Sequence, residues 1–298
     1  MIFLTLLGEF ACKFFGKKCS TIIVGKSVAS YALYNIFMGV IAVIFFFITG
    51  GFSAPINLKT LGYAALYAII SLIALAVGLI AYRFANISTI TLITGTCGIV
   101  TTSLFGAILF HESFSPSTVI RIVLMLVATS LSFIDRREPV EDAPSGEKSR
   151  KKNSLWVIVI VVIMLAYQSA AAIVQKYFSQ DPSVTSENSF FLYSNLMIVA
   201  VSLFVFALDS TKNREHGREA CRMFRFRLMF PVVANVLASV AGSLIGIFLI
   251  ARLPLSVYSP LLMAIGLLGG VLGSIAHRER LGVCSYLGAA LALITVFI

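Results

Sequence analysis

The stretch ASYALYNIFMGVIAVIFFFITG at Ala29–Gly50 contains no charged residue. A helix needs about 20 consecutive apolar residues to cross the hydrocarbon core of a bilayer. This stretch has that length, and its apolar residues do not alternate with polar ones as they would in a strand of a membrane barrel. We therefore expect a membrane-spanning helix at 29–50.

The whole chain has the composition of a polytopic membrane protein. Of its 298 residues, 59% are hydrophobic and 12% are charged, and the mean hydropathy is +0.97. Soluble domains contain roughly 45–50% apolar and about 25% charged residues. The composition therefore argues against a soluble enzyme, a disordered protein and a secreted disulfide scaffold.

The same length criterion applied along the chain predicts ten membrane helices. They are expected at about 1–15, 29–50, 60–82, 87–110, 118–134, 154–178, 187–208, 228–251, 255–276 and 281–298. The first segment is short and contains Glu9 and Lys13, and we expect Lys17 to end it. For that reason we also expect the natural start of the chain to lie upstream of Met1.

A charged stretch with two prolines divides the chain near its middle. The residues DRREPVEDAPSGEKSRKKN at Asp135–Asn153 have the composition of a polar linker. We therefore divide the chain into a first five-helix half at 1–136, a linker at 137–153 and a second five-helix half at 154–298.

The two halves resemble each other in sequence. At one constant offset the matched pairs are Ala11/Ala170, Lys17/Lys176, Ser30/Ser189, Leu33/Leu192, Tyr34/Tyr193, Met38/Met197, Val40/Val199, Phe45/Phe204 and Phe47/Phe206, with Glu9 opposite Gln168. At two slightly larger offsets the pairs are Ser71/Ser239, Gly78/Gly246, Ser88/Ser256, Gly98/Gly266, Gly106/Gly273, Ile108/Ile275 and Glu112/Glu279. The polar and glycine pairs indicate an internal repeat, because apolar matches alone are common between membrane helices.

An odd number of helices in each half implies that the two halves are inverted relative to each other. Inverted repeats are typical of secondary transporters, whose substrate site lies near the bilayer midplane between the repeats. The predicted fold is therefore an all-α polytopic membrane protein with ten transmembrane helices arranged as two inverted five-helix repeats.

The fourth helix of each half begins and ends with a similar motif. A glutamate closes the fourth helix of each half, in LFGAILFHESFS at Leu104–Ser115 and in VLGSIAHRERLG at Val271–Gly282. The entries to these helices are also similar, with ANISTITL at Ala85–Leu92 and ARLPLSVYSPLL at Ala251–Leu262. This plan and these motifs resemble the EamA-like members of the drug/metabolite transporter superfamily. The resemblance implies alternating access around a central cavity and transport of small organic metabolites.

The distribution of basic residues predicts the orientation in the membrane. Most of the 23 lysines and arginines lie in the odd-numbered connections between helices, and the positive-inside rule places such connections in the cytoplasm. This puts both termini outside, whereas members of the resembling family more often keep them inside. We expect a multi-pass protein of the bacterial inner or plasma membrane.

Glu9 is the carboxylate that lies well inside a predicted membrane helix. A charge at that depth costs roughly 2.5–3.5 kcal/mol on insertion scales. One interpretation is a proton carrier, as in small multidrug pumps of the same superfamily, which use a glutamate in their first helix. The other is an ion pair with Lys13, one turn further along the helix.

Polar residues in the predicted helices are the remaining candidates for the cavity. Gln168 occupies the place of Glu9 in the second half, where it either hydrogen-bonds a substrate or joins two helices. The hydroxyl-rich fourth helix contributes Thr91 and Thr94. The other candidates are Tyr34, Tyr193, Asn195, Asn235, Ser239, Tyr258 and Ser259. Paired glycines such as Gly242 and Gly246 are interpreted as helix-packing positions.

We therefore expect a secondary active transporter, either exporter or importer, that moves small organic metabolites by proton coupling or by exchange. A flippase for lipid-linked or amphiphilic substrates is the alternative, and a membrane-embedded enzyme is a distant one.

No nucleotide-binding fingerprint or clustered metal-ligand spacing occurs in the sequence. Neither a cofactor, a metal, a catalytic residue nor a nucleic-acid partner is expected. The expected partners are the solute, the lipid bilayer and protons, with the chain as a monomer or homodimer.

Overall fold

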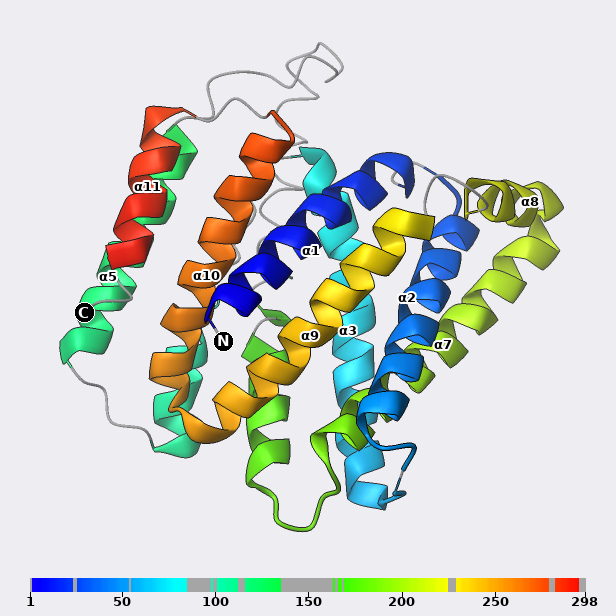
Figure 1. Ribbon diagram of the computed structural model, residues 1–298, viewed down its shortest axis with the longest axis horizontal. Helices are drawn as coiled ribbons and strands as arrows, with labels where there is room; N and C mark the ends of the chain where they lie inside the picture. Colours follow the sequence, from blue (N-terminus) through cyan, green and yellow to red (C-terminus); the bar gives the residue numbers. More distant parts are fainter. Residues whose placement is uncertain are drawn as a thin grey trace.

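The computed structural model describes residues 2–23, 26–53, 55–84, 98, 101–111, 116–134, 163, 166–167, 169–224, 229–278 and 282–294. Within these ranges the chain forms helices, turns and bends and no strand (Figure 1). The all-α class predicted from the sequence is therefore confirmed for the described part of the chain.

Most of the described residues belong to helices. Their bounds are α1 Ile2–Ile23, α2 Val28–Thr49, α3 Leu58–Phe84, α5 Pro116–Ile134, α7 Glu187–Lys212, α8 Arg214–Met223, α9 Met229–Arg252, α10 Leu255–Ala276 and α11 Val283–Ile294. Residues Thr101–Phe110 and 169–180 are also helical. The bounds of α2, α9 and α10 agree with the predicted segments to within one residue.

Three of the described helices are long and apolar enough to cross a membrane: α2, α7 and α9. Shorter apolar helical stretches occur at Leu58–Ala74, Thr101–Phe110, Val119–Ala128 and Ile265–Ala276. Many large apolar side chains are exposed on the outside of the bundle, including Phe204 on α7 and Phe230 on α9. These features are compatible with a membrane protein.

The predicted end of the first helix is wrong. We expected Lys17 to end it, but α1 continues to Ile23 and passes through Lys17 and Lys18. The charge of a lysine limits how deeply a helix is buried in lipid. It does not end the helix, because lysine is a good helix former. Helix α8 lies in a stretch expected to be a connection, because its polar residues give no membrane-helix signal.

Helices α2 and α7 pack along their length and run in opposite directions (Figure 1). The close approach depends on Gly39, where an added Cβ would lie 2.5 Å from a methyl carbon of Val199. Further along the pair, the rings of Phe46 and Phe191 stack with centroids 5.0 Å apart. Both rings are almost fully buried, so this contact forms part of the main hydrophobic core.

Helices α2 and α7 begin with the same contact between two serine side chains. Ser27 precedes α2 and its Oγ lies 3.1 Å from Oγ of Ser30. Ser186 precedes α7 and its Oγ lies 3.1 Å from Oγ of Ser189. Serine is favoured at this position because its side chain can satisfy backbone groups that have no partner within the helix. Ser186 does so by accepting from the backbone N–H of Ser189, whereas the side chain of Ser27 makes no such hydrogen bond. Ser30 and Ser189 are a matched pair of the sequence repeat, and Ser27 and Ser186 fall at the same offset.

Each end of this helix pair is joined by polar contacts. At one end the backbone N–H of Ala29 donates to Oδ2 of Asp209 over 2.8 Å. At the other end Oγ1 of Thr49 donates to Oδ1 of Asn188 over 3.3 Å. The beginning of each helix is therefore fixed to the end of the other.

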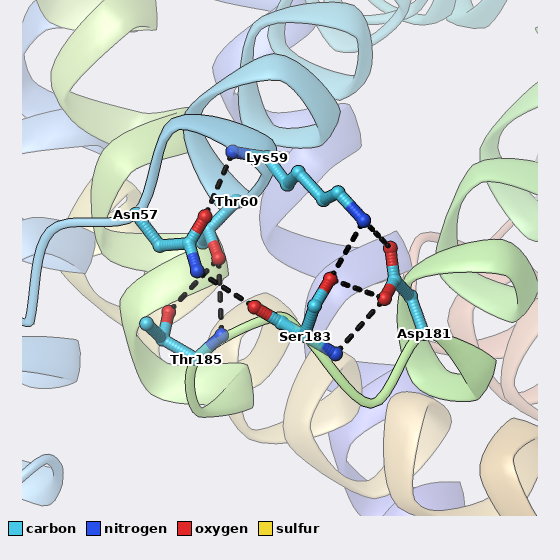
Figure 2. Close-up of polar contacts among 6 residues, drawn as sticks. All are labelled: Asn57, Lys59, Thr60, Asp181, Ser183 and Thr185. Carbon is cyan, nitrogen blue, oxygen red and sulfur yellow. Dashed lines mark hydrogen bonds and ion pairs between the residues drawn. The ribbon is translucent and has the colours of Figure 1, made fainter.

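A second polar network joins the start of α3 and the preceding Asn57 to the segment before α7 (Figure 2). Nδ2 of Asn57 donates to the carbonyl oxygen of Ser183 over 2.6 Å, and Oγ1 of Thr185 donates to Oγ1 of Thr60 over 3.1 Å. Nζ of Lys59 donates to Oγ of Ser183 over 2.9 Å. These contacts connect residues of the first and second halves of the chain at one end of the bundle.

Candidate functional site

A cavity of about 220 Å³ lies inside the bundle. Its walls come from α1, α3, α9 and α10, together with Gly98, Thr102, Tyr167, Ala171, Ala172 and Gln175. The lining residues of the first half are Glu9, Cys12, Lys13, Tyr67, Gly98 and Thr102, and those of the second half are Tyr167, Ala171, Ala172, Gln175, Ala238, Ser239, Gly242, Ser243, Gly246, Tyr258, Leu262 and Gly266. The contributions of α1 and α9 come from the middle of each helix.

The charged part of the wall is an ion pair on α1. Oε2 of Glu9 lies 3.7 Å from Nζ of Lys13, and their side chains are 27% and 23% exposed. The backbone of α10 passes close by, because an added Cβ at Gly269 would lie 3.0 Å from Cβ of Glu9. Glu9 therefore both lines the cavity and has an ion-pair partner, so the contact with Lys13 and a function in the cavity are compatible.

Hydroxyl groups and aromatic rings form much of the remaining wall. Tyr67 on α3, Tyr167 and Tyr258 on α10 all line the cavity. Sequence analysis selected Tyr258 but not the other two. Tyr67 lies one helical turn before Ser71, the residue that the repeat matches to Ser239, so this repeat position was the signal that could have identified it. We find no comparable sequence signal for Tyr167.

One face of α9 supplies small residues to the cavity. Ser239, Gly242, Ser243 and Gly246 recur at helical spacing along it. The Oγ of Ser243 donates to the carbonyl oxygen of Ser239 over 2.9 Å. An added Cβ at Gly242 would meet nothing within 4 Å, whereas one at Gly246 would lie 3.2 Å from Oη of Tyr258. Gly242 therefore leaves open space, and Gly246 accommodates a neighbouring tyrosine.

The fourth segment of the first half contacts the second half beside the cavity. Thr102 lines the wall and its Oγ1 donates to the carbonyl oxygen of Gly98 over 2.5 Å. The neighbouring Thr101 accepts a hydrogen bond from Oγ of Ser169. Hydroxyl groups of this segment therefore bond both to their own helix and across to the other half of the chain.

Of the residues selected from the sequence, Glu9, Ser239 and Tyr258 line the cavity. Tyr34 and Asn235 lie in the core instead, where Nδ2 of Asn235 donates to Oη of Tyr34 over 2.9 Å. Both are buried and neither is among the lining residues.

The remaining selected residues are on α7 or outside the described part of the chain. Nδ2 of Asn195 donates to the carbonyl oxygen of Phe191 in its own helix over 2.8 Å, and Tyr193 packs against the main core. Thr91, Thr94 and Gln168 lie outside the described residues, and so does the side chain of Ser259, whose backbone belongs to α10.

Comparisons with known proteins give a fold and no family. No protein-family model matches the chain, and no curated protein matches it. Among solved structures, 26 chains match. One of them, described only as the crystal structure of a protein, is 14% identical with a TM-score of 0.62, over 98% of this chain and 94% of that chain. At this identity the likeness shows a shared fold over nearly the whole chain.

Proposed function

We propose that the protein is a secondary transporter of small organic solutes, similar to the EamA-like drug/metabolite transporters, in the cell membrane. Ten helices in two inverted halves would expose the cavity alternately to the two sides of the membrane. The observation that carries this proposal is a cavity within an apolar bundle that is lined by residues from both halves of the chain, among them the charged Glu9 and Lys13.

The origin of the cavity walls supports the proposal. The first half contributes α1, α3, and Gly98 with Thr102, which belong to its first, third and fourth predicted helices. The second half contributes the stretch with Tyr167 and Gln175, α9 and α10, which belong to the equivalent helices. Gly98 and Gly266 are matched by the sequence repeat, and both line the cavity. A site shared in this way by two related halves is typical of inverted-repeat transporters.

The helix contacts support an inverted relationship between the halves. Helices α2 and α7 are equivalent in the repeat and pack antiparallel, as an inversion requires. Helices α5 and α11, also equivalent, lie side by side at one edge of the bundle (Figure 1). The contact of α3 with α7 has its counterpart in the contact of α9 with α2.

Glu9 is the residue we propose for proton coupling. Its carboxylate lies on the cavity wall 3.7 Å from the Lys13 ammonium. A proton that binds Glu9 removes this attraction and frees Lys13 to interact with a solute. A proton that leaves Glu9 restores the ion pair. Loading and unloading of Glu9 would therefore change the charge that the cavity presents to its solute.

Proton flux in proteoliposomes tests this function. A panel of small organic solutes is applied to vesicles containing the wild-type protein, and the internal pH is recorded. We expect some solutes to drive proton movement that is lost in Glu9→Gln. The control is Glu187→Gln, because Glu187 is exposed at the start of α7 and is absent from the cavity wall. Solute counterflow that persists in Glu9→Gln, without proton movement in either protein, would make the protein an exchanger and leave Glu9 structural. Absence of movement of every solute in all proteins would contradict the proposal.

A further inference from the structure

Helix α8 lies across one end of the α2–α7 pair (Figure 1). Its inner face is small and apolar: Gly217 and Ala220 are buried, and the ring of Phe224, just beyond the helix, stacks on Phe37 with centroids 4.9 Å apart. An added Cβ at Gly217 would lie 2.7 Å from Oγ of Ser210 on α7. The helix is therefore held firmly against the bundle in a fixed rotation.

Three arginines form a row along α8. Arg214, Arg218 and Arg222 follow one another at four-residue spacing, which places them on one side of a helix. All three are exposed. Within the described part of the chain, none of them has a carboxylate at ion-pair distance or another polar partner. The row therefore presents fixed positive charge to its surroundings.

The acidic residues near this row are largely occupied elsewhere. Oε1 of Glu219 pairs with Nζ of Lys26 over 2.8 Å, and this hydrogen bond lowers the pKa of the Glu219 carboxyl below its usual value. Asp209 accepts from the backbone of Ala29 and lies 3.2 Å from Nδ1 of His216. Glu215 stands in the first turn of α8, where the positive end of the helix dipole favours a carboxylate.

The neighbouring helices set the depth of α8 in a bilayer. It connects α7 and α9, which are both long and apolar enough to cross a membrane. The last turns of α7 expose Phe204 and Leu208, whose side chains are 64% and 54% accessible. Such apolar surface is suited to contact with acyl chains, so α8 lies at the level where lipid headgroups begin. This placement requires only that α7 and α9 span the membrane and is independent of the transport proposal.

We propose that the row Arg214, Arg218 and Arg222 binds the phosphate groups of anionic phospholipids. Guanidinium groups match phosphate oxygens with paired hydrogen bonds, and the headgroup region supplies phosphates in a layer parallel to α8. The unpaired arginine row favours an anionic headgroup over a zwitterionic one, because the anionic headgroup carries a net negative charge. The ligand is therefore an anionic phospholipid of the leaflet on the α8 side.

Native mass spectrometry of the full-length protein tests this site. The protein is incubated with equal amounts of phosphatidylglycerol and phosphatidylcholine, and the bound lipids are counted. We expect the wild type to retain phosphatidylglycerol preferentially. Each near-surface arginine favours an anionic membrane by roughly fivefold, so the triple variant R214Q/R218Q/R222Q should bind phosphatidylglycerol about 100-fold more weakly. The single variant Arg218→Gln should bind about fivefold more weakly and serves if the triple variant does not fold.

Arg252→Gln is the matched control, because this exposed arginine ends α9 and its guanidinium lies 3.6 Å above the Phe248 ring. It should leave the lipid preference unchanged. The proposal is overturned if the triple variant retains phosphatidylglycerol like the wild type, or if Arg252→Gln loses it equally. It is also overturned if inorganic phosphate at the concentration of the lipid displaces phosphatidylglycerol from the wild type, because the site would then bind free phosphate.

Discussion

Glu9 has both of the properties that the sequence offered as alternatives, an ion-pair partner and a place in the cavity wall. It forms an ion pair with Lys13 one turn along α1 and also lines the cavity. An ion pair lowers the cost of keeping a carboxylate in a largely apolar bundle. The same pair gives the cavity a charge distribution that a proton can change, which is the basis of the coupling we propose.

Gly269 allows α10 to approach α1 beside Glu9. A Cβ there would lie 2.9 Å from the backbone nitrogen of Phe10 and 3.0 Å from the backbone carbon of Glu9. Gly269→Ala should therefore destabilise the protein by about 1–3 kcal/mol, because backbone atoms have to move. The measurement is thermal unfolding in detergent. Gly242→Ala is the matched control, since its Cβ would meet nothing within 4 Å. Equal unfolding temperatures for the two variants would contradict this packing.

The sequence predicted part of the cavity wall and missed the rest for a physical reason. Burial of a charge in an apolar segment singled out Glu9, and Ser239 and Tyr258 were selected as polar residues of the predicted helices. Tyr34 and Asn235 were selected on their polarity, yet they satisfy each other by a hydrogen bond in the core. Polarity within an apolar helix indicates that a partner is needed, but it does not distinguish a neighbouring helix from a solute.

At the scale of elements, the end of α9 is held by a buried lysine. Nζ of Lys176 donates to the carbonyl oxygens of Ile250 and Leu253 over 3.0 and 2.9 Å. The last carbonyls of a helix have no partner within the helix, so this ammonium supplies hydrogen bonds where the helix dipole is negative. The contact joins the segment 169–180 to α9.

Lys176→Met should destabilise the protein by about 2–3 kcal/mol, because the carbonyl oxygens at the end of α9 lose charge-assisted hydrogen bonds. Thermal unfolding of the purified protein measures the effect. Lys212→Met serves as the control, since Lys212 is exposed at the end of α7 and should change stability little. An unchanged unfolding temperature in Lys176→Met would show that the lysine does not stabilise α9.

The network between the start of α3 and the segment before α7 predicts a pH dependence. Oδ1 of Asp181 accepts from the backbone N–H and Oγ of Ser183, and Lys59 lies 3.6 Å from the other oxygen. These contacts lower the pKa of the Asp181 carboxyl from its ordinary value of 3.8. Because the folded-state pKa is depressed, the stabilisation is complete well above 3.8 and is lost as the pH falls through the lowered value.

Asp181→Asn should therefore unfold at a lower temperature than the wild type at neutral pH, and the difference should disappear once the pH falls below the lowered pKa of the Asp181 carboxyl. Unfolding curves recorded at a series of pH values test this. A difference that is constant across the pH range would assign the effect of the substitution to a cause other than the carboxylate charge.

The elements differ in how well the sequence predicts them. Long uncharged segments fix α2 and α9 closely, because their length must match the bilayer. The end of α1 was misplaced because lysines limit burial in lipid but not helix formation. Helix α8 is held through Gly217 and Ala220 against α2 and α7. Two small buried residues in a polar sequence do not predict such a tertiary contact.

At the scale of the whole molecule, the sequence repeat predicts more than any single motif. It equates Ser27 and Ser30 with Ser186 and Ser189, and the two pairs make the same contact at the start of α2 and α7. It also equates helices that pack antiparallel. The repeat does not specify the solute, because the side chains that line the cavity differ between the halves.

Alternating access of the cavity to the two sides of the membrane can be measured by cysteine labelling from each side. The five native cysteines are replaced, and a single cysteine is introduced by Ser243→Cys in the cavity wall. The control is Ser194→Cys, at a fully buried core position on α7. In vesicles of known orientation, we expect a membrane-impermeant maleimide to label Ser243→Cys from either side and to leave Ser194→Cys unlabelled. Labelling of Ser243→Cys from one side alone, under every solute and proton gradient applied, would contradict the account.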